Sequence, residues 1–100
     1  MLNDAFRRTP RLGVVVVTQG VAALGDEVAE RTKRSIAEYD SFCPANDPYG
    51  EGDFGSLQMD GRVIFWKIDY FDTAMRMHSP DPADPTVTTR VMTVMLADEY

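Results

Sequence analysis

The dipeptide Asp60-Gly61, between two β-rich runs, constrains the fold more than any other feature of this sequence. The flanking runs are residues 54–59 and 62–71. Asp-Gly favours a two-residue type I′ turn, because both of its positions accept a positive φ. Such a turn fixes the register of an antiparallel hairpin over residues 54–71. The expected facing pairs are Met59 with Arg62, Leu57 with Ile64, and Gly55 with Trp66.

The two faces of this hairpin differ in composition. Alternation along the strands gives one apolar face, which consists of Leu57, Met59, Ile64, Trp66 and Ile68. The opposite face of the second strand carries Val63, Phe65 and Phe71, with Lys67 and Asp69 between them. A strand that is apolar on both faces is either central and covered twice, or covered once with its second face kept for a partner.

The rest of the chain predicts one α+β domain over residues 1–100, in the order α-β-α-β-β-α. Residues 3–8 favour a short helix, and the β-branched run 12–18 favours a buried strand. Residues 26–39 have helical apolar spacing, and Asp84-Pro85 is typical of a helix start, which predicts a second long helix over 85–98. We therefore expect a three-stranded, mainly antiparallel sheet packed by helices 26–39 and 85–98.

The charge of the chain is acidic and unevenly distributed. The formal net charge is −6, and residues 1–40 are neutral, with six acids and six bases. The excess lies in residues 41–100, where ten acids face four bases: Arg62, Lys67, Arg76 and Arg90. A chain that binds nucleic acid directly needs a basic surface, so this composition argues against nucleic acid as a direct ligand.

The single cysteine, Cys43, excludes an internal disulfide and fits a reducing compartment. No run of residues has the length and apolar character of a membrane-spanning helix. These features predict a soluble cytoplasmic protein that does not bind membranes.

Chemistry-bearing residues are few, and we expect no catalytic residue, cofactor or resident metal. The loop 46–53 holds Asp47, Glu51 and Asp53, whose oxygens are ligands suited to a hard cation, and His78 lies further along the chain. The same composition is explained by turn formation, since Asn and Asp side chains bond to neighbouring backbone groups in loops. A small metal-dependent enzyme that uses these four residues is therefore an alternative hypothesis.

Aromatic and acidic residues are interleaved in the second half of the chain, as in many protein-binding surfaces. We expect the contact surface to combine loop 46–53 with the exposed face of strand 62–71. The candidate partner-binding residues are Asp47, Tyr49, Glu51, Asp53, Phe65, Lys67, Asp69, Phe71 and Asp72.

Six short runs carry a resemblance to a known family. They are residues 20–24 (GVAAL), 46–51 (NDPYGE), 53–55 (DFG), 65–70 (FWKIDY), 79–85 (SPDPADP) and 88–91 (TTRV). Together they resemble a family of small acidic bacterial proteins of unknown function, typical of alphaproteobacterial plasmids, integrative elements and phages. Where this chain has Gly52, the family pattern has a histidine, and where this chain has Phe71, the family pattern has a tyrosine. The missing histidine counts against an enzyme or a metal site.

The resemblance implies cargo of a mobile element, which often binds and inhibits host defence machinery. The leading hypothesis is therefore a non-enzymatic protein-binding module, an anti-defence inhibitor of the anti-CRISPR or anti-restriction kind. Its partner would be a host nucleic-acid-handling or defence complex. A third hypothesis is a structural domain that forms a homodimer through Val63, Phe65 and Phe71.

Overall fold

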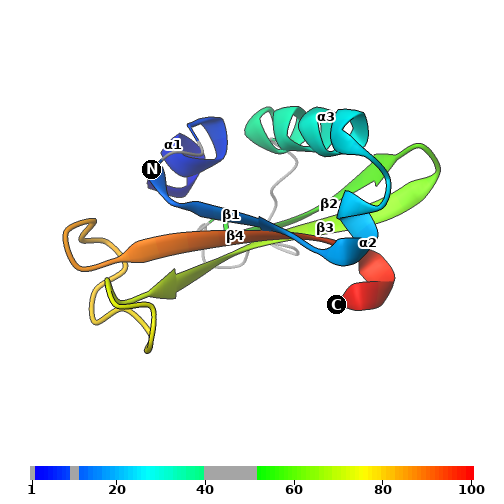
Figure 1. The fold of residues 1–100 in the computed structure, drawn as a ribbon. Helices are drawn as coiled ribbons and strands as arrows, with labels where there is room; N and C mark the ends of the chain where they lie inside the picture. Colours follow the sequence, from blue (N-terminus) through cyan, green and yellow to red (C-terminus); the bar gives the residue numbers. More distant parts are fainter. Residues whose placement is uncertain (1, 10–11, 40–51) are drawn as a thin grey trace.

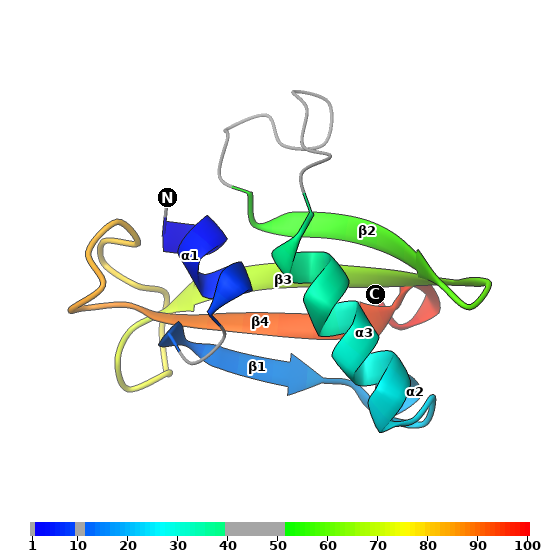
Figure 2. The same cartoon turned by 90° about the horizontal axis from the view of Figure 1, so that it is seen from above.

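The computed structural model describes residues 2–9, 12–39 and 52–100. The elements, in chain order, are α1 (Leu2–Arg8), β1 (Val14–Val17), α2 (Gln19–Ala22), α3 (Asp26–Ala37), β2 (Phe54–Met59), β3 (Arg62–Phe71), β4 (Thr89–Leu96) and the 3₁₀ helix η2 (Ala97–Glu99). The strands form one mixed sheet in the order β1-β4-β3-β2, and the fold is a small α+β domain (Figures 1 and 2).

Strands β2 and β3 pair antiparallel around Asp60-Gly61. Both turn residues have positive φ, +52° and +79°, as a type I′ turn requires. Met59 lies opposite Arg62, and Gly55 lies opposite Trp66. This register places Ile64, Trp66 and Ile68 in the core, each 3% exposed or less.

The expected helix over residues 85–98 is wrong, because Thr89–Leu96 forms the strand β4. The sheet consequently has four strands rather than three, and β1 pairs with β4 in parallel. The physical reason is the position of β4 between β1 and β3, which buries residues of both its faces. A strand buried on both faces has no apolar–polar alternation, and its valines and threonines favour extended backbone.

The helix-start signal at Asp84-Pro85 forms an isolated turn. The Asp84 carboxylate accepts hydrogen bonds from the backbone N–H and the hydroxyl of Thr86, at 2.9 and 2.7 Å. The N–H of Val87 then bonds the Asp84 carbonyl at 3.3 Å. Asp84 thus satisfies the same backbone donors that it would cap in a helix, but extended backbone follows.

Helices α1 and α3 lie together on one face of the sheet (Figure 1). The core between the layers consists of Phe6, Val21, Ile36, Met59, Ile64, Trp66, Ile68, Met92 and Val94. Arg7 of α1 is 2% exposed and donates from Nη1 to the carbonyls of Ile36 and Tyr39, both at 2.8 Å. It therefore binds carbonyls at the C-terminal end of α3, where the Ile36 carbonyl also accepts the backbone N–H of Tyr39 at 3.2 Å.

Candidate functional site

The second face of the sheet is lined by apolar side chains, and neither α1 nor α3 lies on it (Figure 1). We call this surface the open face. By strand alternation and register, its apolar residues are Val14, Val16, Phe54, Val63, Phe65, Phe71, Val91 and Met95. Val16 is 44% and Val63 is 38% exposed, whereas Val91 and Met95 on the central strand are buried. Exposed apolar side chains that share one face of a sheet are typical of an interaction surface.

Three aromatic rings pack together at one end of the open face. The Phe54 and Phe65 ring centroids lie 5.4 Å apart, and Tyr100 contacts both in edge-to-face geometry at 5.9 and 5.7 Å. Tyr100 follows η2 and is 75% exposed. Sequence analysis missed this cluster, although the hairpin register itself places Phe54 opposite Lys67, on the side of Phe65.

On the strand β3, the open face carries one cation and one anion. Lys67 and Asp69 point to the same side of β3, and Lys67 Nζ lies 3.5 Å from Asp69 Oδ2. Their side chains are 41% and 37% exposed, so water screens this ion pair strongly. The charged middle of β3 is therefore formally neutral and accessible.

The other end of the open face is formed by the turn after β3. The rings of Phe71 and His78 stack at 6.4 Å with an interplanar angle of 4°, and the two residues form an isolated β-bridge. The Asp72 carboxylate accepts the backbone N–H of Arg76 at 3.0 Å. Asp72 is thus engaged in shaping the turn.

The expected contact residues do not all lie on one surface. Phe65, Lys67, Asp69 and Phe71 share the open face, as expected from alternation. Asp53 belongs to the other side, because its carboxylate accepts the hydroxyl of Tyr70 at 3.3 Å. Asp47, Tyr49 and Glu51 lie outside the described residues. Within the described ranges, no group of three His, Cys, Asp or Glu residues is arranged to hold a metal ion.

A polar network on the helix-covered side connects α1 with the last two strands. Asn3 Nδ2 donates to the Tyr70 hydroxyl at 2.7 Å, and Arg90 Nε donates to Asn3 Oδ1 at 2.8 Å. The Arg90 guanidinium lies 5.2 Å from the centre of the Tyr70 ring. Burial lowers the pKa of Arg90, because desolvation penalises its charged form.

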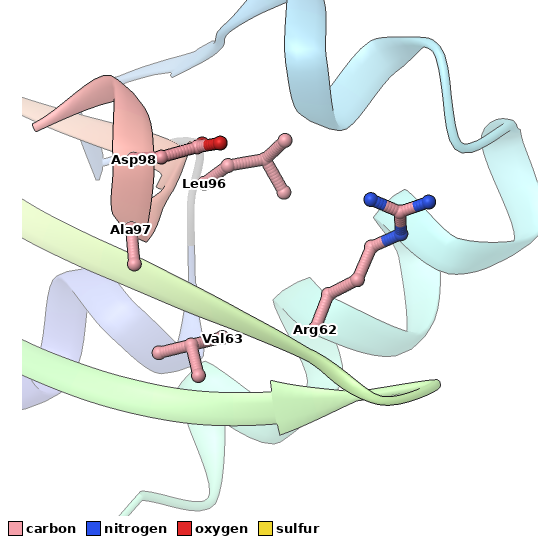
Figure 3. A pocket seen from close by; sticks show the side chains of 5 residues that line it. All are labelled: Arg62, Val63, Leu96, Ala97 and Asp98. Atoms are coloured by element: carbon pink, nitrogen blue, oxygen red, sulfur yellow. The ribbon is translucent and has the colours of Figure 1, made fainter.

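A shallow hollow of about 210 Å³ lies at the η2 end of the sheet (Figure 3). Its lining residues are Arg62, Val63, Leu96, Ala97 and Asp98. Arg62 and Asp98 are both exposed. Since neither charged group is desolvated, the hollow has no anchor for a specific ligand.

Residues 17–99 match the family model described as "Protein of unknown function (DUF3768)". The chain belongs to this family. The DUF3768 match includes α2, α3, β2, β3, β4 and η2, and hence most of the open face. No curated protein and no solved structure matches the chain significantly. None of the helices in the described ranges has the length and apolar character required to cross a membrane.

Proposed function

We propose that this DUF3768 protein is a small non-enzymatic protein-binding module whose contact surface is the open face of the sheet. One observation supports the proposal above all others. The face carries exposed Val16 and Val63, and the aromatic cluster at one end includes Tyr100, which is 75% exposed. Aromatic side chains are enriched among the residues that dominate the energy of protein interfaces.

The charge of the molecule favours a basic partner. The whole chain has a net charge of −6, and residues 52–100 contribute eight acids against four bases, a net of −4. A negative molecule associates faster with a positive one, because long-range attraction steers their encounter. Proteins that handle nucleic acid have basic surfaces. We therefore propose a host nucleic-acid-handling or defence protein as the partner, inhibited by a mobile-element product.

The test compares capture by open-face variants with capture by a matched control. Val63→Asp and Val16→Asp place a charge at exposed positions of the open face, and Ala5→Asp places the same charge on exposed α1. A partner captured from the host is purified and titrated against each variant. We expect binding to Val63→Asp and Val16→Asp to weaken tenfold or more, about 1.4 kcal/mol, because the new charge is desolvated at the contact.

One further result decides the nature of the partner, and another decides where the contact lies. A captured protein that binds DNA or RNA, and that nucleic acid displaces from the open face, supports the proposal. Equal affinity of the wild type and both open-face variants would show that the contact lies elsewhere. Circular dichroism of each variant establishes that the fold is retained.

A homodimer is a second candidate, which the charges on β3 favour. In a two-fold contact between open faces, Lys67 of one copy can pair with Asp69 of the other, because such interfaces are self-complementary. Light scattering would then give twice the chain mass of 11.2 kDa. Lys67→Asp should dissociate this dimer, and the exchange Lys67→Asp with Asp69→Lys should restore it. A mass of 11.2 kDa at high concentration rejects this candidate.

A further inference from the structure

At the opposite end of the molecule, α1 lies beside the segment that leads into β4 (Figure 2). Residues of these two segments, together with Leu12, line a second pocket. Its volume is about 160 Å³, and its lining residues are Leu2, Phe6, Leu12, Pro85, Thr88 and Arg90. Four of these six side chains are apolar, and Arg90 is the only charged one. The pocket is separate from the open face, because Phe6 and Arg90 lie on the helix-covered side.

Arg90 is a buried cation without a carboxylate partner among the described residues. It is 9% exposed, and Nε and Nη2 donate to neutral acceptors, Asn3 Oδ1 at 2.8 Å and the Pro82 carbonyl at 2.5 Å. Its remaining nitrogen, Nη1, has no hydrogen bond to the described part of the chain. A desolvated cation is costly unless an anion compensates it, and a guanidinium matches a carboxylate well.

The other polar group of the pocket is already engaged. The Thr88 hydroxyl donates to the Asp81 carbonyl at 2.8 Å and lies 2.6 Å from the hydroxyl oxygen of Ser79. Arg90 therefore provides the charge that selects a ligand, and the apolar walls select its other end. Leu12 is 60% and Leu2 is 38% exposed, whereas Phe6 is 1% exposed, so the leucines lie at the mouth and Phe6 lies deep.

The volume limits the ligand to a small molecule. A protein cavity of about 150 Å³ lined by apolar side chains accommodates benzene, which has six carbon atoms. We propose that this pocket binds a small monocarboxylate with a short branched aliphatic chain, with its carboxylate on Arg90 and its chain against Phe6 and Leu12. Isovalerate has this size and chemistry.

The probe for a binding test is sodium isovalerate, titrated into the ¹⁵N-labelled full chain and followed by NMR. We expect saturable shifts of the Thr88 and Arg90 amides and of the Arg90 Nε–H, with a Kd on the order of 1 mM for a ligand this small. The uncharged alcohol 3-methylbutan-1-ol, which has the same carbon skeleton, should bind at least tenfold more weakly. Equal binding of the acid and the alcohol, or no saturable shift at about ten times that Kd, would overturn the proposal.

Two pairs of variants locate the site. Leu12→Trp fills the mouth from an exposed position, and Met77→Trp adds the same ring at a 70% exposed position outside the pocket. Isovalerate affinity should fall at least tenfold in Leu12→Trp and should be unchanged in Met77→Trp. Arg90→Gln should also lose binding, with Arg62→Gln as its control. If Arg90→Gln fails to fold, wild-type affinity in Leu12→Trp would still refute the site.

Discussion

Replacing Gly55 with alanine should destabilise the protein, because the Trp66 ring occupies the space that a Cβ atom would need. An ideal Cβ on Gly55 would lie 2.4 Å from Trp66 Nε1 and 2.5 Å from Cε2. The ring has little freedom to move. It is fully buried, Tyr39 packs edge-on against it at 5.5 Å, and the Arg7 guanidinium lies 5.6 Å from its centre.

The size of the effect follows from two opposing contributions. Inserting a methyl group into a filled core typically costs about 1–3 kcal/mol. Alanine also restricts the unfolded chain relative to glycine, which offsets about 0.4–1 kcal/mol of that cost. Subtracting the upper value of the second range from the upper value of the first leaves a net loss of about 2 kcal/mol in the free energy of unfolding. For a chain of this length it corresponds to a fall in Tm of about 10 °C.

Trp66 is the only tryptophan in the chain, so its fluorescence reports directly on this contact. We expect Gly55→Ala to lower Tm and to shift the emission, whereas Ser56→Ala, at an exposed neighbouring position, should change neither. Because phenylalanine is smaller than tryptophan, Gly55→Ala should cost less in a Trp66→Phe background than in the wild type. A Gly55→Ala protein with wild-type Tm and emission would refute the steric argument.

Two more predictions concern hydrogen bonds. Tyr70→Phe removes the bonds of its hydroxyl with Asn3 and Asp53 and should cost about 1–2 kcal/mol in urea denaturation; an unchanged midpoint would contradict the network. Hydrogen bonds from the Thr18 hydroxyl and the backbone N–H groups of Leu96 and Gly20 lower the pKa of Glu99. The contribution of Glu99 to stability is therefore present above pH 4.5, the ordinary pKa of glutamate, and is lost as the pH falls through the lowered pKa of Glu99. The Tm difference between the wild type and Glu99→Gln should thus shrink in acid, and a constant difference would refute the role of Glu99.

Local signals were sufficient for some elements. The Asp60-Gly61 turn determines which residues of β2 and β3 face each other, because turn geometry and register are coupled. The apolar spacing of residues 26–39 identified α3 (Asp26–Ala37). Both signals act between residues that are close in the sequence.

The strand β4 could not be identified in this way. Its extended state depends on two partner strands from distant parts of the chain. These are β1 and β3, which pair with its two edges. A nearby turn at Asp84-Pro85 supplied a valid capping signal in a context that does not continue as a helix. Tertiary pairing and the valines and threonines of β4 decided the outcome against the local capping signal.

The residues of the candidate site were predictable only where strand alternation determines the side on which they lie. Alternation alone placed Phe65, Lys67, Asp69 and Phe71 on one face. It could not show that Asp53 turns to Tyr70 on the other side, or that Tyr100 joins Phe54 and Phe65. The pocket at Arg90 was also inaccessible to sequence reasoning, because its walls come from α1, from Leu12 and from residues 85–90.

The position of β4 has a consequence for the order of assembly. Among the described strands it comes after the other three in sequence, and it lies between β1 and the hairpin, with Val14 opposite Val91 and Ile68 opposite Met92. Until the ribosome releases Thr89–Leu96, β1 lacks β4, the strand with which it pairs, and the β4-facing edge of β3 lacks the same partner. The nascent chain therefore presents an exposed strand edge to other chains until β4 has been synthesised. The insertion of β4 therefore completes the sheet in one step, because this strand joins β1 to the hairpin.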